Sequence, residues 1–162
     1  MKRRLALALL LVAVGLGFGC PGYSTHSLFR PDIKTVYVQA FDNKTFRRGL
    51  EVPLTRDIVE EIKLRTPLLF AARDEADSVL SGELVDFSLR TQVKSKEEQV
   101  LITSVSAKVR FRWMDRLTGM DIVPPQDVED SVRIALALEP SQEDLVFREI
   151  AKRIVERMQE PW

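Results

Sequence analysis

Residues that could perform catalysis are scarce in this chain of 162 residues, and they are poorly placed. The only cysteine is Cys20 and the only histidine is His26. A nucleophile and a base of these types can cooperate in principle. Here, however, both lie close behind an apolar N-terminal run, where no shaped pocket would surround a general base. A hydrolase is therefore the weakest of the functional hypotheses.

Acidic residues cluster at positions 74–77 and 127–130. Neither cluster has the spacing of a calcium loop, and neither comes with histidines for a transition metal. The seven glycines form no phosphate-cradling pattern. We therefore expect no enzyme activity, no metal site and no cofactor.

Recognition of anionic groups is the other chemistry to consider. Residues 101–113 alternate apolar with mostly polar side chains, which predicts a strand with one core face. Its polar face carries Lys108, Arg110 and Arg112, and Arg90 of the preceding predicted strand joins them. Arginine suits forked contacts with phosphate, so these four residues are candidate ligands for an anionic glycolipid. A solvated face of an antiparallel sheet is the simpler explanation of the same pattern.

A second candidate contact site is the predicted loop that contains Phe46, Arg47 and Arg48, followed by a glycine. An exposed loop with an aromatic residue and two arginines can be a partner-contact site. The same four residues can also form an ordinary turn.

The N-terminus reads as an export signal. Residues 1–4 are basic, and residues 5–18 form fourteen uninterrupted apolar residues. This length fits a signal-peptide core of about 7–15 residues better than a membrane span of about 20. The run ends at Gly19-Cys20, which matches the end of a bacterial lipoprotein signal, although Gly17 stands where that pattern usually has Leu, Val or Ile. We expect acylation of Cys20, with simple signal cleavage nearby or a buried, unmodified cysteine as alternatives.

These features divide the chain into a signal peptide (residues 1–19), a lipid anchor and tether (residues 20–31) and a single domain (residues 32–162). Removal of 19 residues leaves 143, which is enough for one domain with its own core. The signal holds three of the 24 basic residues and no acidic residue, so the mature chain has a formal charge of −3. A nucleic-acid-binding domain usually has a strong basic excess, so we expect no nucleic-acid partner.

The first elements of the domain are a strand and a helix. Residues 35–41 are rich in β-branched and aromatic residues and predict a strand. Both of its faces are largely apolar, so we expect it to be paired on both sides or covered. Helical spacing begins at Leu54, and Thr66-Pro67 ends the helix, because a proline disfavours helix at the residue before it.

Two long strands follow, joined by a hairpin loop at residues 94–98. The first of them changes apolar phase at Leu84-Val85, which predicts a β-bulge near Gly82. If both strands turn their apolar faces to one core, Leu89 pairs with Val105 and Phe87 with Ala107. The same register places Asp86 opposite Lys108.

The last predicted strand has two halves, residues 120–123 and 130–138, interrupted by residues 124–129. Gly119 is available for a left-handed conformation in the turn before it. A final helix begins after Ser141, which is a good N-cap. Its apolar stripe consists of Phe147, Ile150, Ala151, Ile154, Val155 and Met158. The predicted fold is thus α+β: a two-layer sandwich in which two helices pack on one face of an antiparallel sheet of about four strands.

The order and spacing of these elements resemble the LPS-assembly lipoprotein LptE family. The shared features are the lipobox cysteine with Gly-Tyr soon after it, the strand pattern over Ile33 to Asn43, the helix around Leu54 to Ile62, the Ala-Asp-x-x-Leu-x-Gly strand over Ala76 to Gly82, a long hairpin and a C-terminal helix. The resemblance extends from Gly22 to about Met158.

This resemblance implies a non-enzymatic, lipid-anchored protein of the outer membrane, facing the periplasm or lying within a barrel lumen. Its expected partners are an LptD-like outer-membrane β-barrel, which it would plug and help to assemble, and lipopolysaccharide or a related glycolipid, which it would help to insert into the outer leaflet. The alternative is an independent periplasmic lipoprotein that binds an amphiphile or a cell-wall component.

Overall fold

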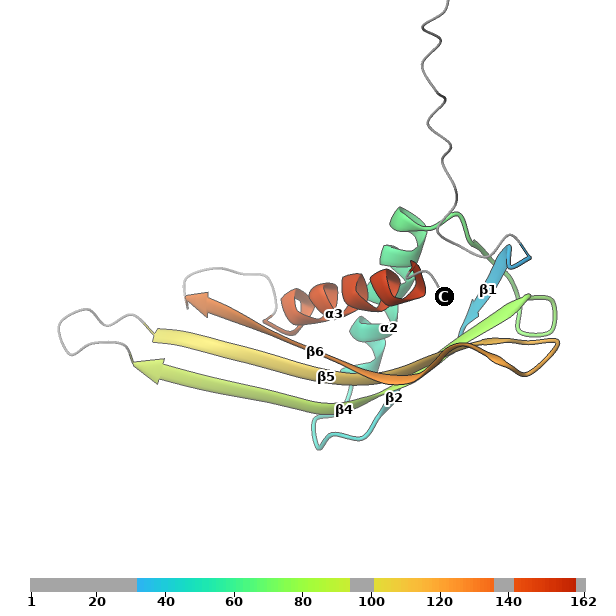
Figure 1. Cartoon of the computed structure of the whole chain (residues 1–162). Coiled ribbons are helices and arrows are strands. Elements are labelled where there is room, and N and C mark those ends of the chain that lie inside the picture. The colour runs from blue at the N-terminus through green and yellow to red at the C-terminus, as the bar shows by residue number, and fades with distance from the viewer. Residues whose placement is uncertain (1–31, 94–100, 136–141, 160–162) are drawn as a thin grey trace, which may run out of the picture.

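The computed structural model describes residues 32–93, 101–135 and 142–159. It has the predicted α+β architecture, with two helices on one face of a sheet (Figure 1). The elements in chain order are β1 (Thr35–Val38), β2 (Asp42–Asn43), α2 (Glu51–Arg65), β3 (Leu69–Phe70), β4 (Ser78–Val93), β5 (Leu101–Asp115), β6 (Asp121–Ala135) and α3 (Gln142–Gln159).

The sheet differs from the prediction in size and in strand direction. Its six strands run in the order β3-β1-β4-β5-β6, with β2 paired to β4 off this path. The long strands β4, β5 and β6 form an antiparallel meander, whereas β1, β2 and β3 all pair in parallel. Parallel neighbours need a long crossover connection, and α2 provides one between β1 and β3. The predicted pairing of the first strand on both of its sides is confirmed.

The predicted register of the long hairpin is confirmed. Leu89 pairs with Val105, Phe87 with Ala107 and Asp86 with Lys108. The register shifts between Leu84 and Asp86, where the sequence indicated a β-bulge. Because one extra residue is inserted there, the apolar side chains before and after the bulge face the same helices. Gly119, in the β5–β6 turn, has the predicted positive φ of 71°.

The first strand ends at Val38 rather than at residue 41. Two other predicted boundaries were wrong around prolines. Helix α2 begins at Glu51 rather than at Leu54, and it includes Pro53. The first N–H groups of a helix have no intrahelical partner, so a proline fits in the first turn. Likewise β6 is one strand through Pro124 and Pro125 instead of two halves. It lies at the edge of the sheet, where a missing N–H donor is tolerated, and its register with β5 is irregular beside this pair.

The core lies between the helix layer and the inner face of the sheet. Every residue of the predicted stripe on α3 is fully buried, and Val146 joins it. From the other elements the core takes Leu54, Ile58 and Ile62 of α2 together with Val105, Ala107, Val109, Phe111 and Trp113 of β5. The predicted N-cap Ser141 and the hairpin loop lie outside the described residues.

Asp77 attaches the start of β1 to the start of β4. One oxygen of its carboxylate accepts hydrogen bonds from the backbone N–H groups of Lys34 and Thr35, both at 2.9 Å. The backbone N–H of Asp77 donates to Thr35 Oγ1 at 2.7 Å. These contacts, first of all the hydrogen bond from Lys34, lower the pKa of Asp77. The acidic residue of the Ala-Asp-x-x-Leu-x-Gly pattern is therefore a structural clamp.

Candidate functional site

The predicted basic strip lies on the outer face of the sheet, opposite the helices. Lys108, Arg110 and Arg112 alternate along β5 with Val109 and Phe111, which are buried toward the helices. Arg90 of β4 lies on the same outer face. It pairs with Ser104, which is on the same face of β5 as Lys108, Arg110 and Arg112. The sequence thus placed the four candidate ligand-binding residues on one surface.

Carboxylates of the neighbouring strands contact the three β5 bases. Arg110 makes a forked contact with Asp127 of β6, with Nε at 2.8 Å from Oδ1 and Nη2 at 3.3 Å from Oδ2. Lys108 Nζ lies 3.0 Å from Asp127 Oδ2, and Arg112 Nε lies 2.9 Å from Asp121 Oδ1. The hydrogen bonds with Asp127 raise the pKa of Arg110, and those from Arg110 and Lys108 lower the pKa of Asp127.

Strand register explains this neutralisation. Arg110 lies in one cross-strand row with Glu83 and Asp127, and Lys108 lies in the next row between Asp86 and Glu129. Each of these rows has two acidic residues and one basic residue. Opposite charges placed directly across a sheet stabilise one another, so this part of the strip offers an anion little net attraction.

Positive charge is concentrated farther along the same face. Arg90 of β4 and Arg133 of β6 flank Ser104 of β5, and this row contains no acidic residue. Both arginines are exposed. Arg133 was not predicted from the sequence because β6 had no assigned register, and only the register places Arg133 in one row with Arg90.

A small hollow opens at the opposite end of the outer face. Its volume is about 250 Å³, and its lining includes Asp42, Glu83, Arg110, Arg112 and Pro125. Pockets for drug-sized molecules usually measure about 300–1,000 Å³. The hollow is smaller than that and is lined by charges of both signs, so it fits a single polar group better than a complete amphiphile.

The second candidate site, the loop between β2 and α2, is fixed by the side chain of Asn43. Its Nδ2 donates to the Arg47 carbonyl at 2.7 Å and to Glu51 Oε2 at 2.9 Å. Its Oδ1 accepts from the backbone N–H of Thr45 at 2.9 Å and from Thr45 Oγ1 at 2.7 Å. The hydrogen bond from Asn43 also lowers the pKa of Glu51. One amide group therefore links both ends of the loop.

The three candidate residues of this loop differ in the contacts that they make. Phe46 is fully exposed, with a relative exposure of 108%. The guanidinium of Arg47 lies over the ring of Phe87 on β4, 5.4 Å from its centroid, and that ring is 5.8 Å from the ring of Phe147 on α3. All three side chains are exposed, but Arg47 contacts the domain through the Phe87 ring.

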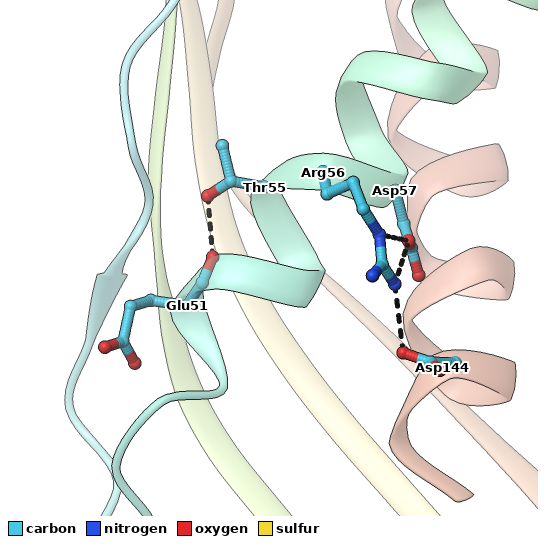
Figure 2. A network of polar contacts seen from close by, with 5 residues as sticks. All are labelled: Glu51, Thr55, Arg56, Asp57 and Asp144. Atoms are coloured by element: carbon cyan, nitrogen blue, oxygen red, sulfur yellow. Dashed lines mark hydrogen bonds and ion pairs between the residues drawn. The ribbon is translucent and has the colours of Figure 1, made fainter. Parts of the chain in front are cut away.

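A polar contact joins the two helices near the same loop (Figure 2). Arg56 of α2 donates to Asp57 Oδ1 and reaches Asp144 of α3 with Nη2 at 3.0 Å. Burial raises the pKa of Asp57 and outweighs the opposing effect of Arg56.

At the start of the helix, Thr55 Oγ1 donates to the Glu51 carbonyl at 2.8 Å and accepts from the Phe41 N–H at 3.0 Å. These bonds position the N-terminal turn of α2 beside the loop.

Cys20 and His26 lie outside the described residues. Within the described ranges, no group of three or more metal-binding side chains comes together. None of the described helices is long and apolar enough to cross a membrane.

Solved structures show where this fold occurs. The hypothetical protein CT253 from Chlamydia trachomatis matches with a TM-score of 0.55 at 13% identity, covering 78% of this chain and 96% of that chain. The PelC dodecamer from Paraburkholderia phytofirmans matches with a TM-score of 0.54 at 13% identity, covering 85% of this chain and 96% of that chain. At these identities the likeness concerns the fold alone.

Sequence comparison gives the family. No curated protein matches the chain. The family model described as "LptE: Lipopolysaccharide-assembly" matches residues 33–160, which includes every described element of the domain. This family consists of non-enzymatic lipoproteins of lipopolysaccharide assembly. The chain belongs to the LptE lipopolysaccharide-assembly family.

Proposed function

We propose that this protein is an outer-membrane lipoprotein that binds an LptD-like β-barrel, plugs it, supports its assembly, and helps to insert lipopolysaccharide into the outer leaflet. The observation that carries the proposal is the family match over residues 33–160. The Gly19-Cys20 ending of the N-terminal apolar run supports an acylated anchor.

For the glycolipid we propose contacts on the outer face of the sheet, first of all at Arg90 and Arg133. They share a row without acidic residues, and arginine forms strong, forked contacts with phosphate. Lys108, Arg110 and Arg112 would contribute only after exchanging their present contacts with Asp121 and Asp127 for contacts with the ligand.

The proposed barrel partnership is tested by purifying tagged full-length protein from its native membranes in mild detergent and identifying the accompanying proteins by mass spectrometry. A large β-barrel in stoichiometric amount is the expected result. Recovery of the lipoprotein alone, in a detergent that preserves barrel complexes, would favour the independent ligand-binding lipoprotein instead.

The glycolipid contact is tested separately with purified lipopolysaccharide as the probe. Replacing both Arg90 and Arg133 with Gln should weaken binding and reduce its dependence on salt. Arg110→Gln combined with Arg112→Gln is the matched control on the same face, because it also removes two charges. We expect a smaller loss because these guanidinium groups already bind Asp127 and Asp121. An equal loss of affinity for the two variants would show that lipopolysaccharide does not prefer the row of Arg90 and Arg133 to the control positions on the same face.

A further inference from the structure

The exposed ring of Phe46 projects from a loop whose backbone is already fixed. The loop backbone is tied to its two flanks: the N–H of Lys44 donates to the Leu84 carbonyl at 3.0 Å, and Asn43 Nδ2 bonds both the Arg47 carbonyl and Glu51. Thr45 Oγ1 additionally accepts from the N–H of Arg47 at 3.3 Å. A side chain on such a loop loses little backbone freedom when it binds, which favours affinity.

Arg47 braces the loop from its other side. Its guanidinium lies over the Phe87 ring, which itself packs beside Phe147 of the core helix α3. A cation over an aromatic face is attracted by the ring. This contact connects the loop to the inner face of the sheet and holds the exposed Arg47 guanidinium against Phe87. The predicted contact trio therefore divides into an exposed ring (Phe46), a brace (Arg47) and a solvent-directed cation (Arg48).

The charges around the loop argue against a lipid surface as its target. Basic loops bind anionic membranes through a local excess of positive charge. Here the bases Lys44, Arg47 and Arg48 are accompanied by the acids Asp42, Glu51 and Glu83. Of these, Glu83 lies 4.0 Å from Lys44 and is shared with Arg110 of β5. An electrically balanced site with one fixed aromatic ring fits a shaped protein pocket.

We infer that Phe46 is an aromatic anchor that inserts into an apolar pocket of a protein partner, and that Arg48 binds a carboxylate or carbonyl group at the rim of that pocket. Aromatic residues, phenylalanine included, are enriched at protein interfaces, and the residues that dominate binding energy lie in well-packed, desolvated pockets. The inference rests on the proposed function only in assuming a protein partner, and it adds the chemistry of the contact.

The direct test is photo-crosslinking in native membranes. A benzophenone amino acid replaces Phe46 in the full-length protein, and mass spectrometry maps the adducts formed under light. We expect adducts on one peptide of one protein, in an apolar pocket with an acidic or carbonyl-rich rim. The control is the same replacement at Leu117, which is 76% exposed in the β5–β6 turn. Adducts on lipids, adducts spread over many proteins, or no adduct at residue 46 would each overturn the inference.

Affinity for the mapped partner provides the second measurement. Phe46→Ala should weaken binding by about tenfold or more, whereas Phe46→Trp should retain most of it. Leu117→Ala, the matched control, should bind as the unaltered protein does. Since the ring is fully exposed, Phe46→Ala should leave thermal unfolding unchanged, so a loss of affinity cannot come from misfolding. Equal affinity of Phe46→Ala and the unaltered protein contradicts the inference.

The outcomes separate this inference from the proposed function. If a β-barrel co-purifies but residue 46 forms no specific adduct, the anchor is wrong and the barrel partnership stands. If residue 46 labels one pocket of another protein and no barrel co-purifies, the anchor stands and the barrel partnership is wrong.

Discussion

The ring of Phe41 packs directly against the backbone of Gly82 in β4. A Cβ atom at position 82 would lie 2.4 Å from Phe41 Cε1 and 2.6 Å from the carbonyl oxygen of Arg110. Only a glycine allows this approach, and the ring fills the space that a side chain would occupy. The glycine of the Ala-Asp-x-x-Leu-x-Gly pattern thus admits the buried aromatic residue that precedes β2.

Gly82→Ala should lower the free energy of unfolding by about 1–3 kcal/mol, as overpacking typically does. The Phe41 ring and the Arg110 carbonyl would both have to move, and the backbone carbonyl is the harder of the two to displace. Chemical denaturation measures the change. Ser81→Ala, on the neighbouring residue, is the control and should stay close to the unaltered protein. If the two variants unfold alike, the close approach is relieved without cost.

Asp77 should make stability depend on pH in the acidic range. Its pKa is lowered in the folded state, so its charged form contributes stability above the pKa of the unfolded chain, and this contribution is lost as pH falls through the folded pKa. Asp77→Asn should therefore be less stable than the unaltered protein at neutral pH, with the difference shrinking as the pH falls into the acidic range. Denaturant unfolding at a series of pH values measures it. A difference that is constant with pH would contradict the role of the charge.

Val109 and Arg110 are neighbours on opposite faces of β5. Val109 is completely buried, so Val109→Asp places an unpaired charge in the core and should cost at least about 3 kcal/mol or prevent folding. Arg110→Ala removes only exposed ion pairs and should change stability little. Thermal unfolding of both variants checks the assignment of faces. Similar losses would show that the two faces are reversed or equivalent.

Removal of Arg56 should cost more than removal of Asp144. Asp57 is 6% exposed, and its Oδ1 is bound by Arg56, while its Oδ2 has no hydrogen-bond partner among the described residues. Arg56→Leu leaves this buried carboxylate without its cation and should cost about 1–3 kcal/mol. Asp144→Ala removes a carboxylate that is only half-buried and leaves that cation in place. Denaturant unfolding measures both, and adding Asp57→Leu to the Arg56 variant should restore part of the loss. Equal costs for the two single variants would refute this explanation.

Cys20→Ser should abolish incorporation of labelled fatty acid and leave the precursor on its signal peptide. The reason is chemical, because the thiol of Cys20 is the only one in the chain. Metabolic labelling followed by gel mobility measures it. Continued labelling of the serine variant would overturn the anchor assignment.

The parts of the fold that the sequence predicted well depend on strict periodicity. Alternation along β5 located its buried face, and the phase change at Leu84-Val85 located the bulge. Helical spacing located every buried residue of the predicted stripe on α3. These patterns can be read from the sequence because each buried position requires an apolar side chain, whichever distant residue it contacts.

Features that depend on distant contacts could not be predicted in this way. The pairing of β3 consists of two residues, Leu69 and Phe70, and nothing in their local sequence specifies β1 as the neighbour. The start of α2 was misplaced because Pro53 normally signals a loop. The neutralisation of Arg110 and the shared row of Arg90 and Arg133 follow from the pairing of β6, which the prolines at 124 and 125 obscured.

The two edges of the sheet have a consequence for how this domain behaves among unfolded chains. At one edge β3 has only two residues, and residues 86–93 of β4 pair with β5 alone among the described strands. At the other, β6 contains two adjacent prolines, which cannot donate backbone hydrogen bonds, and charged residues at Asp127, Glu129 and Arg133. Short, charged or proline-containing edges resist the addition of foreign strands. The β6 edge is therefore protected against added strands, whereas residues 86–93 of β4 are the part of the described sheet with backbone groups available for a further strand.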